Sequence, residues 1–196
     1  MCKILTYVIV VCLATGVFAS PTISYEKIEN TSEKMISSSY QTPDTEIKTG
    51  KVTAIINFNH KLIVSQLLKY DNYEKFLPFI TKSKIRSTNN DVSSVSISAK
   101  VMKGLVNIDA LVIAKHQQNS NLSDSIAINL KSGDLKKMNI LFTVEKVSPE
   151  KSILTTHFMI EPNIWLVSNK TFSRYNQVNA RRTVRSLRSF LREVKS

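Results

Sequence analysis

Three histidines are the side chains of this chain that can gain or lose a proton near neutral pH. His60, His116 and His157 are far apart in the sequence, and none belongs to an HxH, HExxH or HxxxH pattern, so we expect no metal site. His157 falls within a predicted strand, and Asp109 and Glu145 fall on other predicted strands. If these three side chains faced one cavity, they could perform acid–base catalysis. The alternative, which we favour, places His157 on the outer side of the sheet, in solvent or in a hydrogen bond.

Other signatures of catalysis or cofactor binding are missing from the sequence. No Gly-x-Ser-x-Gly motif is present, which excludes an α/β-hydrolase. The four glycines are isolated and form neither a GxGxxG motif nor a P-loop, so nucleotide phosphates have no glycine-rich loop to bind. Both cysteines, Cys2 and Cys12, lie in the first 19 residues. We therefore expect no catalytic residue, no metal and no cofactor, although these patterns leave open whether the protein is an enzyme.

The composition is that of a basic globular domain. The 196 residues include 27 Lys and Arg against 15 Asp and Glu, for a formal net charge of +12, and 42% are hydrophobic. This length corresponds to one domain with some additional chain, and the hydrophobic fraction is too high for a disordered protein. From Lys170 onward the chain has eight basic residues and one acidic residue, Glu193. The positive charge therefore gathers at the C-terminal end.

The first 19 residues have the pattern of a secretory signal peptide. Lys3 supplies a short positive region, the apolar stretch 4–13 follows, and Val17 and Ala19 are the small residues that precede a cleavage site. An apolar stretch of about ten residues is too short to span a bilayer as a stable helix. We expect cleavage after Ala19 and a secreted or periplasmic protein. The alternative is an uncleaved N-terminal anchor.

Residues 20–48 are predicted to form an irregular leader. They are rich in Ser, Thr, Glu and Lys and show neither a helical nor a strand period, apart from a short helix expected around 26–36. Three Asn-x-Ser/Thr sequons occur in the chain, and they matter only in a host that glycosylates such sites: Asn30, Asn121 and Asn169.

Residues 49–196 are predicted to form an α+β domain that starts with a strand over 51–58. Asn59 is a good N-cap for a helix over 61–68, and Pro78 ends a second short helix over 73–77. Short turns link the strands that follow, which favours antiparallel neighbours, and a long helix is predicted over 174–194. The six further strands are predicted at 80–87, 93–101, 106–116, 125–130, 139–147 and 153–160.

The predicted C-terminal helix has two distinct faces. Apolar residues at three- and four-residue spacing share one face: Ala180, Val184, Leu187, Leu191 and Val194. An adjacent stripe is basic: Arg181, Arg185, Arg188, Arg192 and Lys195. The apolar face must pack on the sheet, and the basic stripe is either a solvated face or a docking surface for an anionic membrane. Trp165, in the predicted loop before this helix, either caps the sandwich, gates a cavity or touches a membrane.

The residues 70–79, YDNYEKFLPF, are followed by a predicted strand over 80–85. This stretch resembles the START-like superfamily, which includes polyketide cyclases and ubiquinone-binding proteins. The order of the predicted elements around it, a strand, two short helices, six strands and a long helix, is similar to that superfamily as well. The resemblance covers residues 48–195. It implies a helix-grip fold, in which a curved antiparallel sheet of about seven strands wraps around a long C-terminal helix. One departure is the KKMN of residues 136–139, where relatives often have a glycine and an aromatic residue.

Members of this superfamily hold an apolar ligand between the concave face of the sheet and the long helix. The resemblance therefore implies a hydrophobic ligand such as a lipid, quinone, sterol or polyketide. Alternation separates the two faces of each strand but does not show which face points inward. The residues predicted to line the cavity are Asp109, Leu111, Ile113, Phe142, Val144, Thr156, Phe158, Trp165, Val184 and Leu187.

These observations predict a secreted, monomeric, non-catalytic binding or carrier protein for a hydrophobic small molecule. One alternative is a cyclase- or aromatase-like enzyme that acts through His157 or Asp109. The other is a surface-interaction protein whose basic helix docks on anionic lipid. No motif or aromatic interleaving supports nucleic acid binding, and the predicted secretion argues against it.

Overall fold

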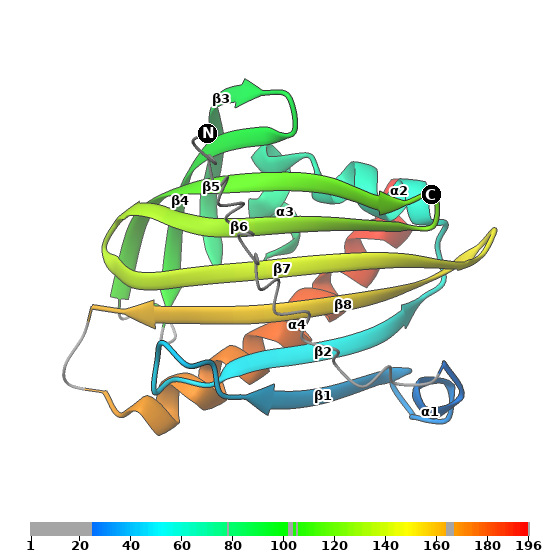
Figure 1. The fold of residues 1–196 in the computed structure, drawn as a ribbon, viewed down its shortest axis with the longest axis horizontal. Helices are drawn as coiled ribbons and strands as arrows, with labels where there is room; N and C mark the ends of the chain where they lie inside the picture. Colours follow the sequence, from blue (N-terminus) through cyan, green and yellow to red (C-terminus); the bar gives the residue numbers. More distant parts are fainter. Residues whose placement is uncertain (1–24, 78, 102–103, 105, 164–166, 196) are drawn as a thin grey trace, which may run out of the picture.

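The computed structural model describes residues 25–77, 79–101, 104, 106–163 and 167–195. In these residues eight antiparallel strands form one sheet, in the order β1-β2-β8-β7-β6-β5-β4-β3 (Figure 1). The strands are β1 (Met35–Tyr40), β2 (Thr49–Ile56), β3 (Ile80–Asn89), β4 (Val92–Val101), β5 (Val106–Ser120), β6 (Ser123–Gly133), β7 (Leu135–Ser148) and β8 (Lys151–Pro162). The predicted signal peptide, Pro78 and Trp165 lie outside the described residues.

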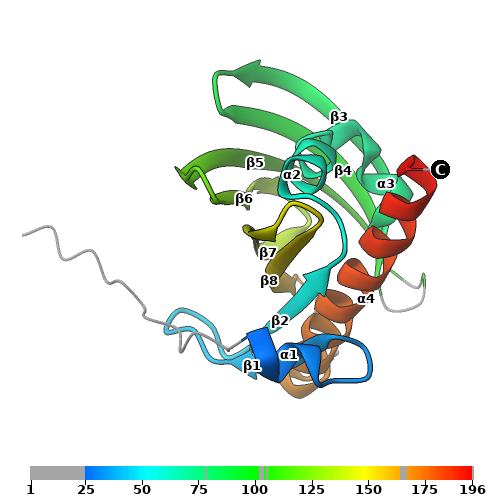
Figure 2. The ribbon, with the colours of Figure 1, turned by 90° about the vertical axis from the view of Figure 1, so that its right-hand side faces the viewer.

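The sheet curves around the helix α4 (Asn169–Lys195), which runs along its concave, inner face (Figure 2). This arrangement confirms the predicted α+β fold with a sheet wrapped around a long C-terminal helix. Val194, near the end of α4, is exposed, but the other apolar residues predicted to pack on the sheet are buried: Ala180, Val184, Leu187 and Leu191. Of the described helices, none combines the length and the apolar character needed to cross a membrane.

Helix α4 packs directly on the backbone of β2 at Gly50. A Cβ atom at Gly50 would lie 2.5 Å from the carbonyl oxygen of Asn176, so only glycine allows this approach. The buried side chain of Asn176 accepts a hydrogen bond from the Ile160 amide at 3.1 Å and donates one to the Lys48 carbonyl at 3.2 Å. These contacts fix the first half of α4 against β2 and β8.

Three short helices follow β2 and form a layer near the C-terminal half of α4 (Figure 2). The first, α2 (His60–Leu67), begins at the predicted N-cap, where Asn59 accepts a hydrogen bond from the Leu62 amide at 2.7 Å. The 3-10 helix η1 (Tyr70–Asn72) leads directly into α3 (Tyr73–Phe76). Phe76 of α3 stacks on Phe190 of α4, with 5.5 Å between the ring centroids.

The segment 20–48 is more ordered than we predicted, because its described part contains the helix α1 (Tyr25–Glu29) and the strand β1. Strand β1 pairs with β2, for example Met35 with Ala54, and is the eighth strand of a sheet for which about seven were expected. Residues 35 and 36, predicted as the end of a helix, are part of this strand. The segment docks through three buried apolar side chains, which are too widely spaced to produce a recognisable period: Ile28, Met35 and Ile47.

Candidate functional site

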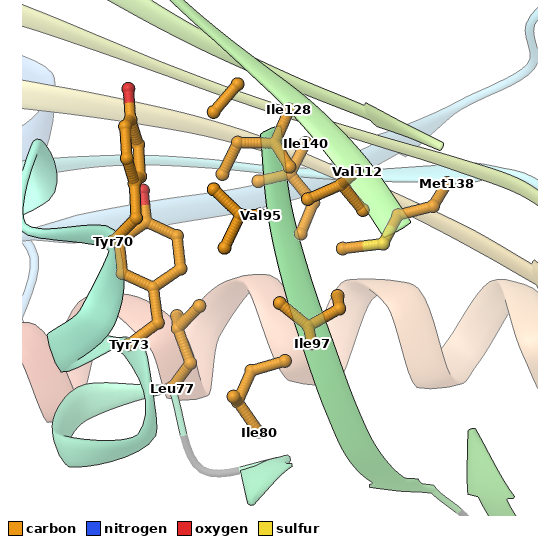
Figure 3. A pocket seen from close by; sticks show the side chains of 11 residues that line it. Tyr70, Tyr73, Leu77, Ile80, Val95, Ile97, Val112, Ile128, Met138 and Ile140 are labelled. Atoms are coloured by element: carbon orange, nitrogen blue, oxygen red, sulfur yellow. The ribbon is translucent and has the colours of Figure 1, made fainter. Parts of the chain in front are cut away.

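A narrow apolar pocket lies between the inner face of the sheet and residues 70–77, which we call the cover segment (Figure 3). Its lining consists of Tyr70, Tyr73, Leu77, Ile80, Val95, Ile97, Val112, Ala114, Ile128, Met138 and Ile140. Between these side chains the open volume is about 10 Å³, which is room for about one water molecule. The pocket is therefore closed in this structure, and its wall is apolar apart from the hydroxyl groups of the two tyrosines.

The strand side of the pocket follows from the two-residue alternation of β-strands. On β5 the buried residues Ile108, Ala110, Val112 and Ala114 point to the inner face. Register then brings Val95 of β4 opposite Val112, so that side chains from neighbouring strands meet in one wall.

The cover segment is fastened to the rest of the molecule by hydrogen bonds. Tyr73 donates its hydroxyl proton to the Leu67 carbonyl at 2.8 Å, and burial raises its pKa well above the ordinary value. Ser83 on β3 donates to the Tyr70 carbonyl at 2.6 Å, and Asp71 accepts from the Ile85 amide at 2.7 Å. Burial and, to a smaller extent, the charge of Asp91 raise the pKa of Tyr70 to about 12. Both tyrosines are thus neutral at physiological pH.

The predicted lining residues divide into two groups in the structure. On β5, Asp109, Leu111 and Ile113 alternate with the buried set and lie on the outer face, so the pocket uses the other set of this strand. Trp165 lies outside the described residues. The remaining predicted residues are fully buried on the inner side, in the core beside the pocket rather than in its wall: Phe142, Val144, Thr156, Phe158, Val184 and Leu187.

Sequence reasoning missed the contribution of the cover segment to the pocket. We used residues 70–79 only to support the family resemblance. The spacing of Tyr70, Tyr73 and Leu77, at three and four residues, puts the three side chains on one side of a helical turn. This spacing was the available signal for the helical side of the pocket.

The three candidate acid–base residues do not converge. His157 lies on the outer face of β8, opposite Leu141 of β7, and the same row of the sheet reaches Lys115 on β5. Asp109 is farther along β5 by about 20 Å, and Glu145 is an exposed residue of β7. His157 instead shares a hydrogen bond of 2.8 Å between its Nδ1 and the Tyr40 hydroxyl, as the favoured alternative predicted.

The other two histidines meet at one buried carboxylate, which their sequence spacing did not indicate. Asp124 of β6 lies 3.0 Å from Nε2 of His60 and 2.6 Å from Nε2 of His116. All three side chains lie at the first turn of α2 and the ends of β5 and β6, so this group joins α2 to the sheet. Among the described residues, no three histidine, cysteine or acidic side chains are arranged to hold a metal ion.

Comparisons with known proteins identify the fold of this chain. No family model and no curated protein matches the sequence. Solved structures do match: a STAR-related lipid transfer protein from Xanthomonas axonopodis superimposes with a TM-score of 0.70 at 9% identity, over 81% of this chain and 93% of that chain. The fold is the START-like helix-grip fold.

Two further START-like structures are similar across most of their length. Human StAR-related lipid transfer protein 5 gives a TM-score of 0.69 at 13% identity, over 83% of this chain and 84% of that chain. The Zhui aromatase/cyclase from a Streptomyces species gives 0.59 at 10% identity, over 83% and 96%. At these identities the similarity shows the fold alone.

The basic stripe of α4 contacts the N-terminal part of this START-like chain. Glu33, in the turn between α1 and β1, accepts a hydrogen bond from Arg185 and lies 3.5 Å from Arg181. Arg188 donates to the main-chain carbonyls of residues 33, 34 and 55. Lys195 lies 3.3 Å from the carboxylate of Glu150. Arg181, Arg185 and Arg188, which we call the arginine clamp, thus hold the α1–β1 turn against α4.

Proposed function

We propose that this protein is a secreted, non-catalytic carrier or binding protein for a small hydrophobic molecule such as a lipid, quinone or polyketide. The ligand would enter between the inner face of the sheet and the cover segment. The observation that supports this proposal most strongly is the apolar wall of the pocket, built from five strands and the cover segment in a START-like fold. A wall without charged side chains favours a ligand that is itself apolar.

The closed state of the pocket restricts how such a ligand can bind. An open volume of about 10 Å³ is far smaller than a lipid-sized ligand, whose pockets usually measure about 300–1,000 Å³. The cover segment must therefore move away from the strands before a ligand enters. Its hydrogen bonds to β3 are those at Ser83 and Asp71 and one from the Ile80 amide to the Leu77 carbonyl at 3.0 Å, and such bonds can break in water at small net cost.

The proposal is tested by native mass spectrometry of the protein purified from its own host, followed by solvent extraction of any adduct. We expect an apolar adduct that dissociates on denaturation, and a mature chain that begins at Ser20. A clean apo mass, together with no uptake of apolar probes by the purified protein, would contradict the carrier function.

Two matched variants test whether the ligand occupies the pocket. Ala114→Leu adds a larger side chain to the pocket wall, while Ala127→Leu adds the same side chain on the outer face of the neighbouring strand. We expect the adduct to disappear in Ala114→Leu and to remain in Ala127→Leu, with thermal unfolding used to confirm that both variants fold. Equal adduct levels in the two variants would place the ligand elsewhere.

A further inference from the structure

A second hollow lies outside the apolar pocket, between the C-terminal half of α4, the turn after α1 and the end of β2. We call it the basic groove. Its volume is about 330 Å³, and none of its lining residues lines the apolar pocket. The lining consists of Ser32, Glu33, Lys34, Ile55, Asn57, Phe58, Arg188 and Arg192. Unlike the pocket, the groove combines cationic, polar and apolar side chains with one anionic side chain, that of Glu33.

Arg188 is fixed in this groove by neutral partners. Its Nη1 donates to the Glu33 carbonyl at 2.8 Å, and its Nη2 donates to the carbonyls of Lys34 at 2.9 Å and Ile55 at 2.7 Å. These bonds use three of the five N–H groups of a guanidinium. Burial lowers the pKa of Arg188; the charge of Glu33 opposes this, and the charges of Arg192 and Arg185 lower it further. An additional negative charge in the groove would therefore stabilise this half-buried cation.

The acidic side chains around the groove are already engaged. The carboxylate of Glu33 pairs with Arg181 and Arg185, and Lys34 pairs with Glu29 at 2.8 Å. Within the described part of the chain, no carboxylate lies within 4.0 Å of the Arg188 or Arg192 guanidinium. Two positive charges consequently face the groove without an ion-pair partner.

We propose that the basic groove binds a phosphate monoester. Such a group carries a charge of about −2 at neutral pH and presents several acceptor oxygens. This charge and these acceptors match the guanidinium groups of Arg188 and Arg192, which form no ion pair among the described residues. Asn57 and Ser32 add an amide and a hydroxyl to the lining, and both can donate hydrogen bonds to phosphate oxygens. Phe58 and Ile55 provide an apolar wall for the organic part of the ligand.

The test is a calorimetric titration of the full-length mature protein with inorganic phosphate at low ionic strength. Arg192 is exposed at the groove, so Arg192→Gln removes a charge without opening the core. Arg182→Gln is the matched control, because Arg182 is an exposed residue of the same helix that does not line the groove. We expect phosphate affinity to fall at least about tenfold in Arg192→Gln and to stay within about twofold in Arg182→Gln.

A phosphate monoester can belong to a soluble metabolite or to the headgroup of phosphatidic acid. Phosphatidylcholine vesicles containing phosphatidic acid are compared with vesicles in which phosphatidylserine gives the same surface charge. Binding to inorganic phosphate and to phosphatidic acid vesicles, both weakened by Arg192→Gln, supports the lipid source. Binding to phosphate without vesicle binding supports the soluble source. No phosphate binding at millimolar concentration, or equal losses in Arg192→Gln and Arg182→Gln, overturns the proposal.

Discussion

His157 shows how burial changes the behaviour of one side chain. It lies on the outer face, yet Tyr40 reaches across β2 to it, and the two rings meet edge to face at 5.7 Å. Burial, and to a smaller extent the charge of Lys51, lowers the pKa of His157 from 6.5 to about 4. The unfolded chain therefore binds this proton more readily than the folded protein. The contribution of neutral His157 to the free energy of unfolding is complete above pH 6.5 and is lost as the pH falls from 6.5 towards 4.

We therefore expect the free energy of unfolding to fall by about 1–2 kcal/mol through His157 between pH 7 and pH 4, after allowance for partial exposure. Urea unfolding across this range measures the effect in the wild type and in His157→Gln, which keeps a hydrogen-bonding partner for Tyr40. Between pH 7 and pH 4, the free energy of unfolding of His157→Gln should fall by about 1–2 kcal/mol less than that of the wild type. Glu29 and Glu33, whose pKa values their basic partners lower, contribute an acid-dependent loss to both proteins. Parallel pH profiles would contradict the role of His157.

The two-residue alternation in the sequence separates the two faces of each strand, but it could not show which face points inward. On β5 both faces are partly apolar, so Leu111 and Ile113 were as plausible as Val112 and Ala114. The choice depends on the direction in which the sheet curves and on the side that α4 covers, which are properties of the assembled sheet. On β7, β8 and α4 the predicted residues, such as Phe158 and Val184, do lie on the inner side.

At the scale of elements, the arginine clamp explains two features that the sequence could not connect. The basic stripe of α4 was predicted to be a solvated face or a membrane surface, and residues 20–48 were predicted to be irregular. In the structure the two segments bind each other, because Arg188 donates to the carbonyls of residues 33, 34 and 55 where β1 begins beside the end of β2. Such contacts join residues about 150 positions apart and have no local sequence pattern.

Arg188→Gln is expected to loosen the α1–β1 turn. The substitution removes three charge-assisted hydrogen bonds to carbonyls, which should lower the free energy of unfolding by about 1–3 kcal/mol. Hydrogen exchange measured by mass spectrometry should become faster in residues 31–40, while Arg182→Gln leaves it unchanged. Unaltered protection of residues 31–40 in Arg188→Gln would show that β1 is held by its pairing with β2 alone.

For the whole molecule, the order of the elements after residue 48 was predictable, because short turns and alternating strands leave few antiparallel arrangements. The eighth strand was not, since β1 is a Ser-rich edge strand with one buried apolar residue, Met35. The degree of filling of the interior was not predictable either. It depends on how closely Tyr73 and Leu77 approach β4 and β5, and a strand pattern does not contain that distance.

The closed interior leads to a prediction about access to the pocket. Asp71→Ala removes the carboxylate that accepts from the Ile85 amide, so the cover segment should separate from β3 more often. Asp134→Ala is the matched control, because Asp134 also accepts from a strand amide, that of Asp109 at 2.9 Å, but away from the cover segment.

A neutral apolar dye that fluoresces on burial, such as Nile red, measures access to the pocket in stopped flow. We expect uptake to be several-fold faster in Asp71→Ala and unchanged in Asp134→Ala, because one lost hydrogen bond is worth about 1 kcal/mol, or a factor of about five in the open population. Hydrogen exchange in residues 70–77 should accelerate with it. If uptake is equal in all three proteins, the dye does not enter beneath the cover segment, and the entrance lies at another edge of the sheet.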